Sequence, residues 1–169
     1  MSRLIVFEGV FDPPHIGHYL VVQKAKEELG GHVLVCPSTS TAAQTISKKA
    51  NSSSYEHRMA LCQLGFPNAL IYRHTNTYTY DLVMELKHKF DYLDMTIIHG
   101  PDWNPECYHD FKKFNDCVKF RKINVPEISI RSTLIREKLV KGVSITGLVL
   151  PAVEIMLGNH VYNNQNSMA

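Results

Sequence analysis

Short apolar runs and segments of helical spacing alternate along most of the chain. Apolar runs occur at 4–7, 33–36, 69–72 and 95–98, and 117–120 is a further candidate. Such runs are typical of strands buried on both faces of a parallel sheet. The pattern therefore predicts five strands, connected by segments that are long enough to form helices.

The connecting segments carry apolar residues at helical spacing. The first, at 16–29, ends at a Gly-Gly pair that favours a helix stop, and further helices are expected at about 55–64 and around 82–90. Strands that alternate with helices predict right-handed crossovers. We therefore expect an α/β fold, a doubly wound parallel sheet with helices on both faces.

The length of 169 residues predicts one domain, residues 1–169. A domain of this size buries roughly two-thirds of the surface that its unfolded chain exposes, so a substantial core is expected. A helical segment from about residue 133 is expected to complete this domain.

Polar and glycine-containing turns follow the first, second and fourth predicted strands, at 9–12, 37–38 and 99–102. In a doubly wound sheet, ligands bind beyond the carboxyl ends of the strands, near the switch in strand order. The segment 38–54 is rich in Ser, Thr, Ala and Asn and contains Lys48 and Lys49. We expect a long mobile loop there, either a lid over a site or a solvated linker without a role.

Charge and cysteine spacing exclude several classes of protein. The formal net charge is only +2 and the lysines form short pairs, which does not favour a nucleic-acid partner. The four cysteines contain no C-x-x-C pair, so neither a zinc ribbon nor a thioredoxin-like site is expected. The apolar run at 4–7 is too short for a secretion signal or a membrane span. We expect a cytoplasmic protein with reduced cysteines and no membrane partner.

The segment 9–18 carries the strongest chemical signal. It contains His15 and His18 between a predicted strand and a predicted helix, so both imidazoles are expected to face the same way beside unpaired backbone N–H groups that favour anions. Gly9 would let a ligand approach the backbone, and Gly17 would leave room between the rings. The site would suit a phosphate. The alternatives are a simple helix cap, or a metal site that adds Asp12 and Cys36.

The ten residues 9–18 read G-x-F-D-P-P-H-x-G-H. They resemble the signature of the nicotinate or nicotinamide mononucleotide adenylyltransferases, a family within the H-x-G-H nucleotidyltransferases. The bacterial nicotinate-type enzymes are the most similar. This resemblance implies a Rossmann-like nucleotidyltransferase fold and the transfer of AMP from ATP to a pyridine mononucleotide, with release of pyrophosphate, in NAD biosynthesis.

A second motif, at 130–136, resembles the I-S-x-T-x-I-R motif of that family, with Arg131 in place of its first Ser. Ser132 or Thr133 can cap a new helix whose free N–H groups hold phosphate oxygens, and Arg136 offers a guanidinium fork suited to phosphate. Arg131 either removes one phosphate contact or reinforces the site. The segment 142–153 resembles the family's closing pattern, in which Pro151 starts the last helix.

Three further segments resemble parts of the family's site: 77–81 its pyridine pocket, 99–102 its G-A-D turn, and 58–61 the helix after its mobile loop. The family's stacking tryptophan has no secure counterpart. Trp103 lies close to the acidic residue Asp102, so Phe111 or Tyr108 is expected to take that role.

These resemblances imply the following site. The residues expected to act in catalysis are His15, His18, Arg136 and one of Lys48 and Lys49. Those expected to bind ATP are Gly9, Val10, Phe11, His15, His18, Gly100, Asp102, Ser132, Thr133 and Arg136. Those expected to bind the pyridine nucleotide are Asp12, Ser38, Lys49, Tyr78, Thr79, Trp103 and Phe111.

Mg²⁺ is expected with ATP, bridging its phosphates, and no side chain is assigned to it. The expected partners are small molecules, and an oligomer is possible. Nicotinate is favoured slightly over nicotinamide as the base. Two other functions stay open: adenylyl or cytidylyl transfer to another phosphate acceptor such as phosphopantetheine or a polyol phosphate, and non-catalytic nucleotide sensing.

Overall fold

A computed structural model describes residues 3–90, 94–101, 104–108, 110–114, 116–126 and 129–158. Its strands are β1 (Arg3–Gly9), β2 (His32–Pro37), β3 (Leu70–Ile71), β4 (Asp94–His99) and β5 (Lys119–Lys122). Its α-helices are α1 (Ile16–Leu29), α2 (Ser40–Thr45), α3 (Tyr55–Gly65), α4 (Thr79–Lys89), α5 (Ser132–Val140) and α6 (Pro151–Leu157). Two short 3₁₀ helices are η1 (Pro105–Cys107) and η2 (Phe111–Lys113). Within these ranges, no helix is long and apolar enough to cross a membrane.

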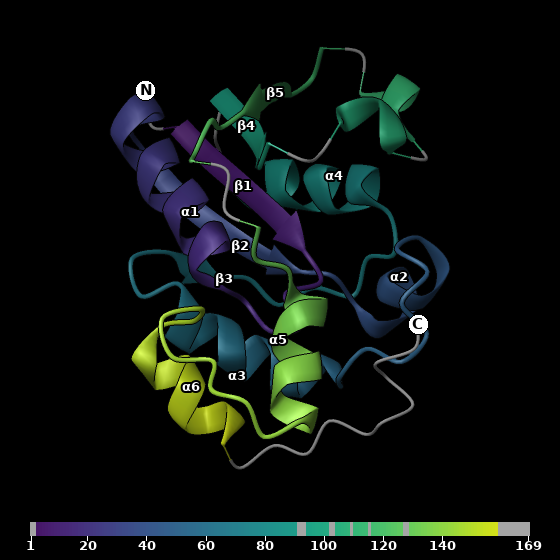
Figure 1. Ribbon diagram of the computed structural model, residues 1–169. Helices are drawn as coiled ribbons and strands as arrows, with labels where there is room; N and C mark the ends of the chain where they lie inside the picture. Colours follow the sequence, from purple (N-terminus) through teal and green to yellow (C-terminus); the bar gives the residue numbers. More distant parts are fainter. Residues whose placement is uncertain are drawn as a thin grey trace.

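The five strands form one parallel sheet in the order β3-β2-β1-β4-β5. The chain first winds outward from β1 through β2 to β3, then returns to place β4 on the other side of β1 (Figure 1). The switch in strand order therefore lies between β1 and β4. This arrangement confirms the predicted α/β fold. In open α/β sheets, ligands bind near the carboxyl ends of the strands at such a switch, which here are those of β1 and β4.

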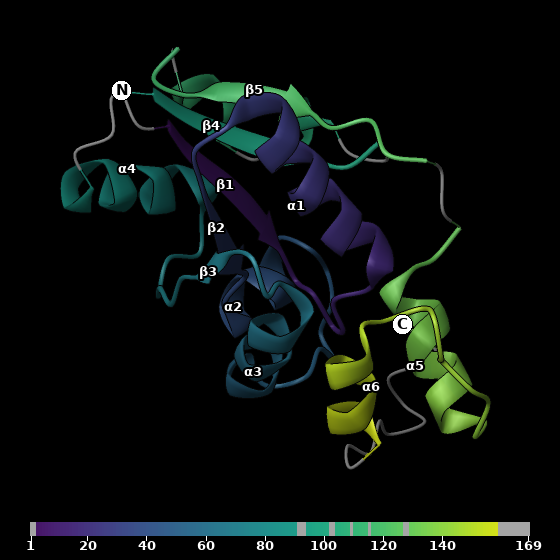
Figure 2. The same ribbon diagram turned by 90° about the vertical axis from the view of Figure 1, so that its left-hand side faces the viewer.

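The two faces of the sheet are covered by different helices (Figure 2). Leu4 and Val6 of β1 pack with buried residues of α4, whereas Ile5 and Phe7 pack with those of α1 and α3. Side chains alternate between faces along a strand, so β1 contributes to both cores. The runs that form β1, β2 and β4 are mostly apolar because these three strands are buried on both faces.

Helices α3, α5 and α6 share a third apolar cluster, which includes Leu61, Ile135 and Val153. These helices lie together beyond the carboxyl edge of the sheet (Figure 1). The expected C-terminal helical segment is therefore present, and Pro151 occupies the first turn of α6 as predicted.

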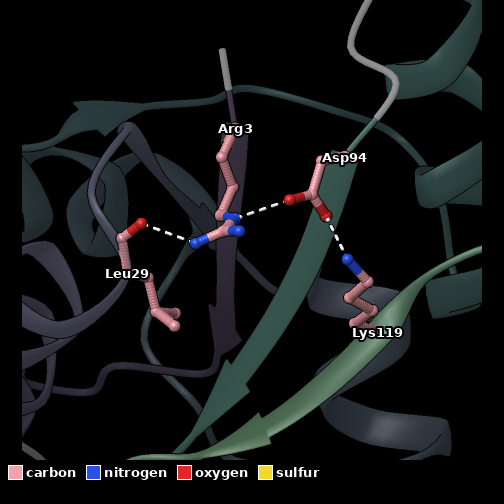
Figure 3. Close-up of polar contacts among 4 residues, drawn as sticks. All are labelled: Arg3, Leu29, Asp94 and Lys119. Atoms are coloured by element: carbon pink, nitrogen blue, oxygen red, sulfur yellow. Dashed lines mark hydrogen bonds and ion pairs between the residues drawn. The ribbon is translucent and has the colours of Figure 1, made fainter. Parts of the chain in front are cut away.

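Polar contacts fasten the opposite, amino edge of the sheet (Figure 3). Arg3 Nε donates to Asp94 Oδ2 at 2.7 Å, and Arg3 Nη1 donates to the carbonyl of Leu29 at 2.6 Å. Lys119 Nζ donates to the other oxygen of Asp94 at 3.1 Å. These contacts join β1, β4, β5 and the end of α1 at the edge that lies away from the switch-point turns.

Three predicted boundaries differ from the structure. The segment 38–54 is not one continuous loop, because Thr39 Oγ1 accepts from Ala42 N and starts the short helix α2, which buries Ala42 and Ala43. The third strand is only Leu70–Ile71, an edge strand with Leu70 exposed. The fifth begins two residues later than expected, because Cys117 N closes a turn onto the carbonyl of Phe114.

Candidate active site

A cavity of about 700 Å³ opens at the carboxyl edge of the sheet. Gly9 at the end of β1, Ser38 just after β2 and His99 at the end of β4 all line it. The first turns of α1, α4 and α5 also contribute lining residues. The cavity therefore lies at the switch point that the topology identifies.

The turn after β1 is shaped by the ring of Phe11. Phe11 has a φ of 52°, uncommon for a large residue, and its ring is held against Phe7, Phe66 and His18. A Cβ at Gly9 would lie 2.8 Å from this ring. The glycine thus makes room for Phe11, and it also lines the cavity, as expected of a position that a ligand approaches.

His15 and His18 stack at the start of α1 with their ring centroids 3.6 Å apart. His15 Nδ1 accepts from Gly17 N, and His18 Nδ1 accepts from His15 N, both at 3.2 Å. A Cβ at residue 17 would lie 3.1 Å from the His15 ring, which explains the glycine between the two histidines. The two Nδ1 atoms thus cap the start of α1, as in the alternative of a simple helix cap. Both rings also line the cavity.

Both imidazoles are neutral near pH 7. Burial, and then the charge of Lys49, lower the pKa of His15 to about 4. Burial, and then His15 and Lys49, lower the pKa of His18 well below its usual value. Because each Nδ1 accepts a backbone N–H, the proton of each neutral ring sits on Nε2. The pair therefore offers two Nε2–H donors to a ligand.

Contacts from α3 and α5 hold this turn. Arg58 is fully buried, and its guanidinium donates to the carbonyl oxygens of Val10 at 2.9 Å and of Ser53 at 3.0 Å. Asp12 Oδ2 accepts from Ser53 N at 2.8 Å. The sequence did not identify Arg58 as a site residue, because its role depends on contacts with segments that are distant in the chain.

The second motif also contacts the turn directly. Ser132 Oγ donates to the carbonyl of Pro13 at 2.8 Å, and Arg136 Nη1 donates to the carbonyl of Asp12 at 2.5 Å. Arg131, rather than Ser132 or Thr133, occupies the N-cap of α5, and its side chain makes no capping bond. The predicted cap is therefore wrong, because the Ser132 hydroxyl is used to dock α5 onto the turn.

The structure distinguishes the two loop lysines. Lys49 lines the cavity, whereas Lys48 does not. Partial burial and the charge of Arg136 lower the pKa of Lys49, while Asp12 opposes this shift. Of the two expected loop lysines, Lys49 is therefore the one that the structure places at the cavity.

Four further residues line the cavity on the α4 side of the sheet: Glu8, Thr79, Tyr108 and Asp110. Thr79 Oγ1 donates to Glu8 Oε2 at 2.7 Å, and Tyr80 N donates to Asp110 Oδ2 at 3.0 Å. Burial, and to a lesser degree Asp110, raise the pKa of Glu8 to about 7. Sequence reasoning missed both acids; the signal for Glu8 is an acidic residue at the end of a buried strand.

Most of the expected site residues meet at this cavity. Those that line it are Gly9, Val10, Phe11, His15, His18, Ser38, Lys49, Tyr78, Thr79, Gly100, Ser132 and Thr133. Those described but not lining it are Asp12, Lys48, Phe111 and Arg136. Phe111 packs against Phe120 instead, with 5.4 Å between ring centroids, so Tyr108 is the one of these two expected stacking residues that lines the cavity. Asp102 and Trp103 lie outside the described residues.

The similar proteins found by comparison carry names that agree with one another. A probable nicotinate-nucleotide adenylyltransferase of Shouchella clausii is 28% identical over 98% of this chain and 100% of its own length. A candidate nicotinate-nucleotide adenylyltransferase of Vibrio parahaemolyticus has a crystal structure that matches 94% of this chain and 100% of its own, with a TM-score of 0.73 and 22% identity.

A third similar protein is the nicotinic acid mononucleotide adenylyltransferase of Plasmodium falciparum in complex with NaAD. Its structure matches 93% of this chain and 95% of its own, with a TM-score of 0.67 and 16% identity. At this level of identity, the two solved structures show a shared fold.

The family model for cytidylyltransferase-like proteins matches residues 6–145, a range that includes the histidine turn, the loop with Lys49 and the motif that starts α5. With most of its 169 residues matched by that model, the chain belongs to the cytidylyltransferase-like family.

Proposed function

We propose that this protein transfers the adenylyl group of ATP to the 5′-phosphate of a pyridine mononucleotide and releases pyrophosphate. The stacked, neutral pair of His15 and His18 at the switch-point cavity carries this proposal. The relatives support it, because their names describe adenylyltransferases for nicotinate mononucleotide. Nicotinate and nicotinamide mononucleotide are therefore the acceptors to compare.

The reaction needs no nucleophile from the protein. A 5′-phosphate oxygen of the mononucleotide attacks the α-phosphorus of ATP and forms a new P–O bond. The bond from the α-phosphorus to the bridging oxygen breaks, and its electron pair leaves with pyrophosphate. Catalysis of such a transfer consists mainly of positioning and electrostatic stabilisation.

The described side chains supply that stabilisation. The Nε2–H groups of His15 and His18 donate to oxygens of the α-phosphate, where charge develops in the transition state. Lys49 and Arg131, which line the same cavity, attract the β- and γ-phosphates and the departing pyrophosphate.

Arg136 acts through the turn rather than on the phosphates. Its guanidinium donates to the carbonyl of Asp12 and to Thr133 Oγ1, so it fixes the histidine turn against α5. We therefore assign Arg136 as a positioning residue.

The donor set also fits Mg²⁺ bound mainly by the substrate. In the described part of the chain, no three His, Cys, Asp or Glu side chains are grouped to hold a metal ion. Mg²⁺ favours phosphate oxygens and retained waters, so ATP itself would supply its ligands. When bound there, the ion neutralises phosphate charge.

The test is acceptor-dependent release of pyrophosphate. Purified protein is incubated with ATP and Mg²⁺ together with nicotinate mononucleotide, nicotinamide mononucleotide or phosphopantetheine, and each rate is compared with the rate without an acceptor. The proposal expects release with a pyridine mononucleotide. Release with phosphopantetheine alone would assign a different acceptor, and ATP binding without any release would support a nucleotide sensor.

A further inference from the structure

Asp12 lies in the histidine turn but does not line the cavity. It is only 3% exposed, so its carboxylate is buried within the protein. The sequence motif predicts a contact with the pyridine nucleotide, and such a contact needs access to the cavity. The described contacts of Asp12 are with the protein itself, and they point to a different task.

Asp12 and Arg58 hold the same residue, Ser53, from two sides. Asp12 Oδ2 accepts from Ser53 N at 2.8 Å, and Arg58 Nε donates to the carbonyl oxygen of Ser53 at 3.0 Å. Through Nη1, the same guanidinium donates to the carbonyl oxygen of Val10 at 2.9 Å. We call Asp12, Ser53 and Arg58 the clasp. It fastens the end of the loop between β2 and α3 to the histidine turn.

The clasp lies one turn of the chain away from Lys49. Ser52 N donates to the carbonyl oxygen of Lys49 at 3.2 Å, so residues 49–52 form a turn that leads directly into the clasp. On the other side, Lys49 N donates to the carbonyl oxygen of Ala43 at 2.8 Å. The backbone of Lys49 is therefore held between α2 and the clasp, while its side chain lines the cavity.

The hydrogen bond to Ser53 alone does not explain the charge of Asp12. Asparagine would accept the same N–H without a buried charge, which is costly unless other charges pair with it. Asp12 Oδ1 is buried, and no described residue donates to it. The described charges that perturb the pKa of Lys49 are two cations and one anion, namely Arg136, Arg58 and Asp12. Burial and Arg136 lower this pKa, and Asp12 opposes them.

We propose that Asp12 is a positioning residue of the adenylyl transfer: through Ser53 and through its negative charge, it keeps the ammonium group of Lys49 beside the triphosphate of ATP. This inference rests on the proposed function, and it gives Asp12 a role that needs no contact with either substrate. The competing explanation is that Asp12 only balances the charge of the buried Arg58. Its loss would then affect the fold without acting through Lys49.

The experiment is a double-mutant cycle that measures kcat/KM for ATP with a pyridine mononucleotide as the acceptor. Asp12→Asn keeps the shape and an acceptor for Ser53 N and removes the charge, whereas Asp12→Ala removes both. Each is combined with Lys49→Ala. Asp116→Asn, at an exposed position that does not line the cavity, is the matched control. Thermal melting shows which variants fold, and either substitution of Asp12 is sufficient to complete the cycle.

Binding of ATP with Mg²⁺ and of AMP, measured by calorimetry without an acceptor, gives a second readout that does not need turnover. AMP carries only the phosphate assigned to His15 and His18, so its affinity reports whether the histidine turn is intact. ATP adds the β- and γ-phosphates assigned to Lys49. A distorted turn would weaken the binding of both nucleotides, whereas a displaced or neutral Lys49 weakens that of ATP.

We expect Asp12→Asn to lower kcat/KM for ATP by about fivefold, and by less than about twofold in a protein that already lacks Lys49. Asp12→Ala should have a larger effect with the same dependence on Lys49. The affinity for ATP should fall in parallel, while the affinity for AMP changes by less than about twofold.

The alkaline loss of activity should begin at a lower pH in Asp12→Asn, because the anion that favours the protonated form of Lys49 is gone. The pH profile of kcat/KM for ATP measures this shift. The other groups that act on Lys49 keep their charge as the pH rises from neutral, since the histidines are already neutral and arginine stays protonated: His15, His18, Arg58 and Arg136.

The outcomes separate this inference from the proposed function. An unchanged kcat/KM in Asp12→Asn, an equal loss with and without Lys49, or equal losses of ATP and AMP affinity would overturn the role of Asp12 and leave adenylyl transfer in place. A loss of ATP affinity that depends on Lys49, without turnover of either mononucleotide, would support the link from Asp12 to Lys49 and overturn adenylyl transfer. Failure of the unchanged protein to bind ATP would overturn both.

Discussion

The neutral charge state of His15 and His18 determines how they can act. Each Nδ1 is occupied by a backbone N–H, and burial lowers the pKa of both rings, so Nε2–H is the group presented to a ligand. Anionic phosphates would raise both pKa values on binding. A second proton would nevertheless have to displace the backbone N–H from Nδ1, so both rings act as neutral Nε2–H donors to the charge that develops on the phosphate.

Replacing His18 by Ala is expected to lower kcat by about 10²- to 10³-fold, the effect typical of removing one donor to a developing oxyanion. The free energy of unfolding should fall by much less, because Phe7 and Phe11 still pack together. Steady-state kinetics and thermal melting measure the two effects. His88→Ala, at an exposed position of α4, is the control. A kcat close to that of the unchanged protein would remove His18 from the mechanism.

Glu8 makes stability depend on pH in a defined direction. Its pKa is about 7 in the folded protein, against an ordinary value of 4.5, so the folded state binds more protons between these values. This stabilisation is complete below pH 4.5 and is lost as the pH rises through 7. Denaturant unfolding of Glu8→Gln should show a gain in stability over the unchanged protein that is larger at pH 8 than at pH 5. An equal difference at both pH values would contradict it.

At the residue scale, the sequence identified the groups that a local motif carries. His15, His18 and Lys49 lie in the segments where the patterns predicted them and line one cavity. Arg58, Glu8 and Asp110 were missed, because each acts through a contact with a segment far away in the chain. A single sequence does not show which distant residues are in contact in the folded protein.

At the scale of elements, the loop between β2 and α3 brings one lysine to the site and leaves its neighbour out. Helix α2 begins at the cap made by Thr39, and the carbonyl of Ala43 then accepts from Lys49 N at 2.8 Å. Lys48 has a φ of 56°, in the left-handed region, and this residue turns the chain after α2 so that Lys49 N reaches Ala43. The short helix thus determines which lysine lines the cavity.

Adjacent lysines therefore provide a matched pair of variants. Lys49→Ala should lower kcat/KM for ATP by about tenfold or more, because a cation beside the phosphates is lost. Lys48→Ala should change it by less than about twofold, the usual range for an exposed position. Initial rates at varied ATP concentration test both. Equal effects of the two substitutions would show that the loop adopts another arrangement when ATP binds.

The elements that the sequence predicted best are those with many apolar neighbours. Strands β1, β2 and β4 form the centre of the sheet, and their apolar runs marked them closely. The edge strands β3 and β5 are short and shifted, since one side of each has no partner strand to fix its limits. Helix α2 was missed because six residues give no helical period, and its cap became visible only in the structure.

At the scale of the whole molecule, the two edges of the sheet differ in structure. The amino edge is fastened by Arg3, Asp94 and Lys119, whereas the carboxyl edge holds the cavity. The strand order places β1 beside β4, so the turn with the histidines faces the end of β4. Alternation of strands and helices predicted this arrangement, and the family match over residues 6–145 agrees with it.

Attack at the α-phosphorus is the central claim, and a label on ATP tests it most directly. The protein is incubated with a pyridine mononucleotide and ATP that carries radioactive phosphorus either at the α- or at the γ-position, and the products are separated. We predict that the α-label appears in the dinucleotide and the γ-label in pyrophosphate. A γ-label transferred to the mononucleotide, or no labelled product from either ATP, would contradict the account.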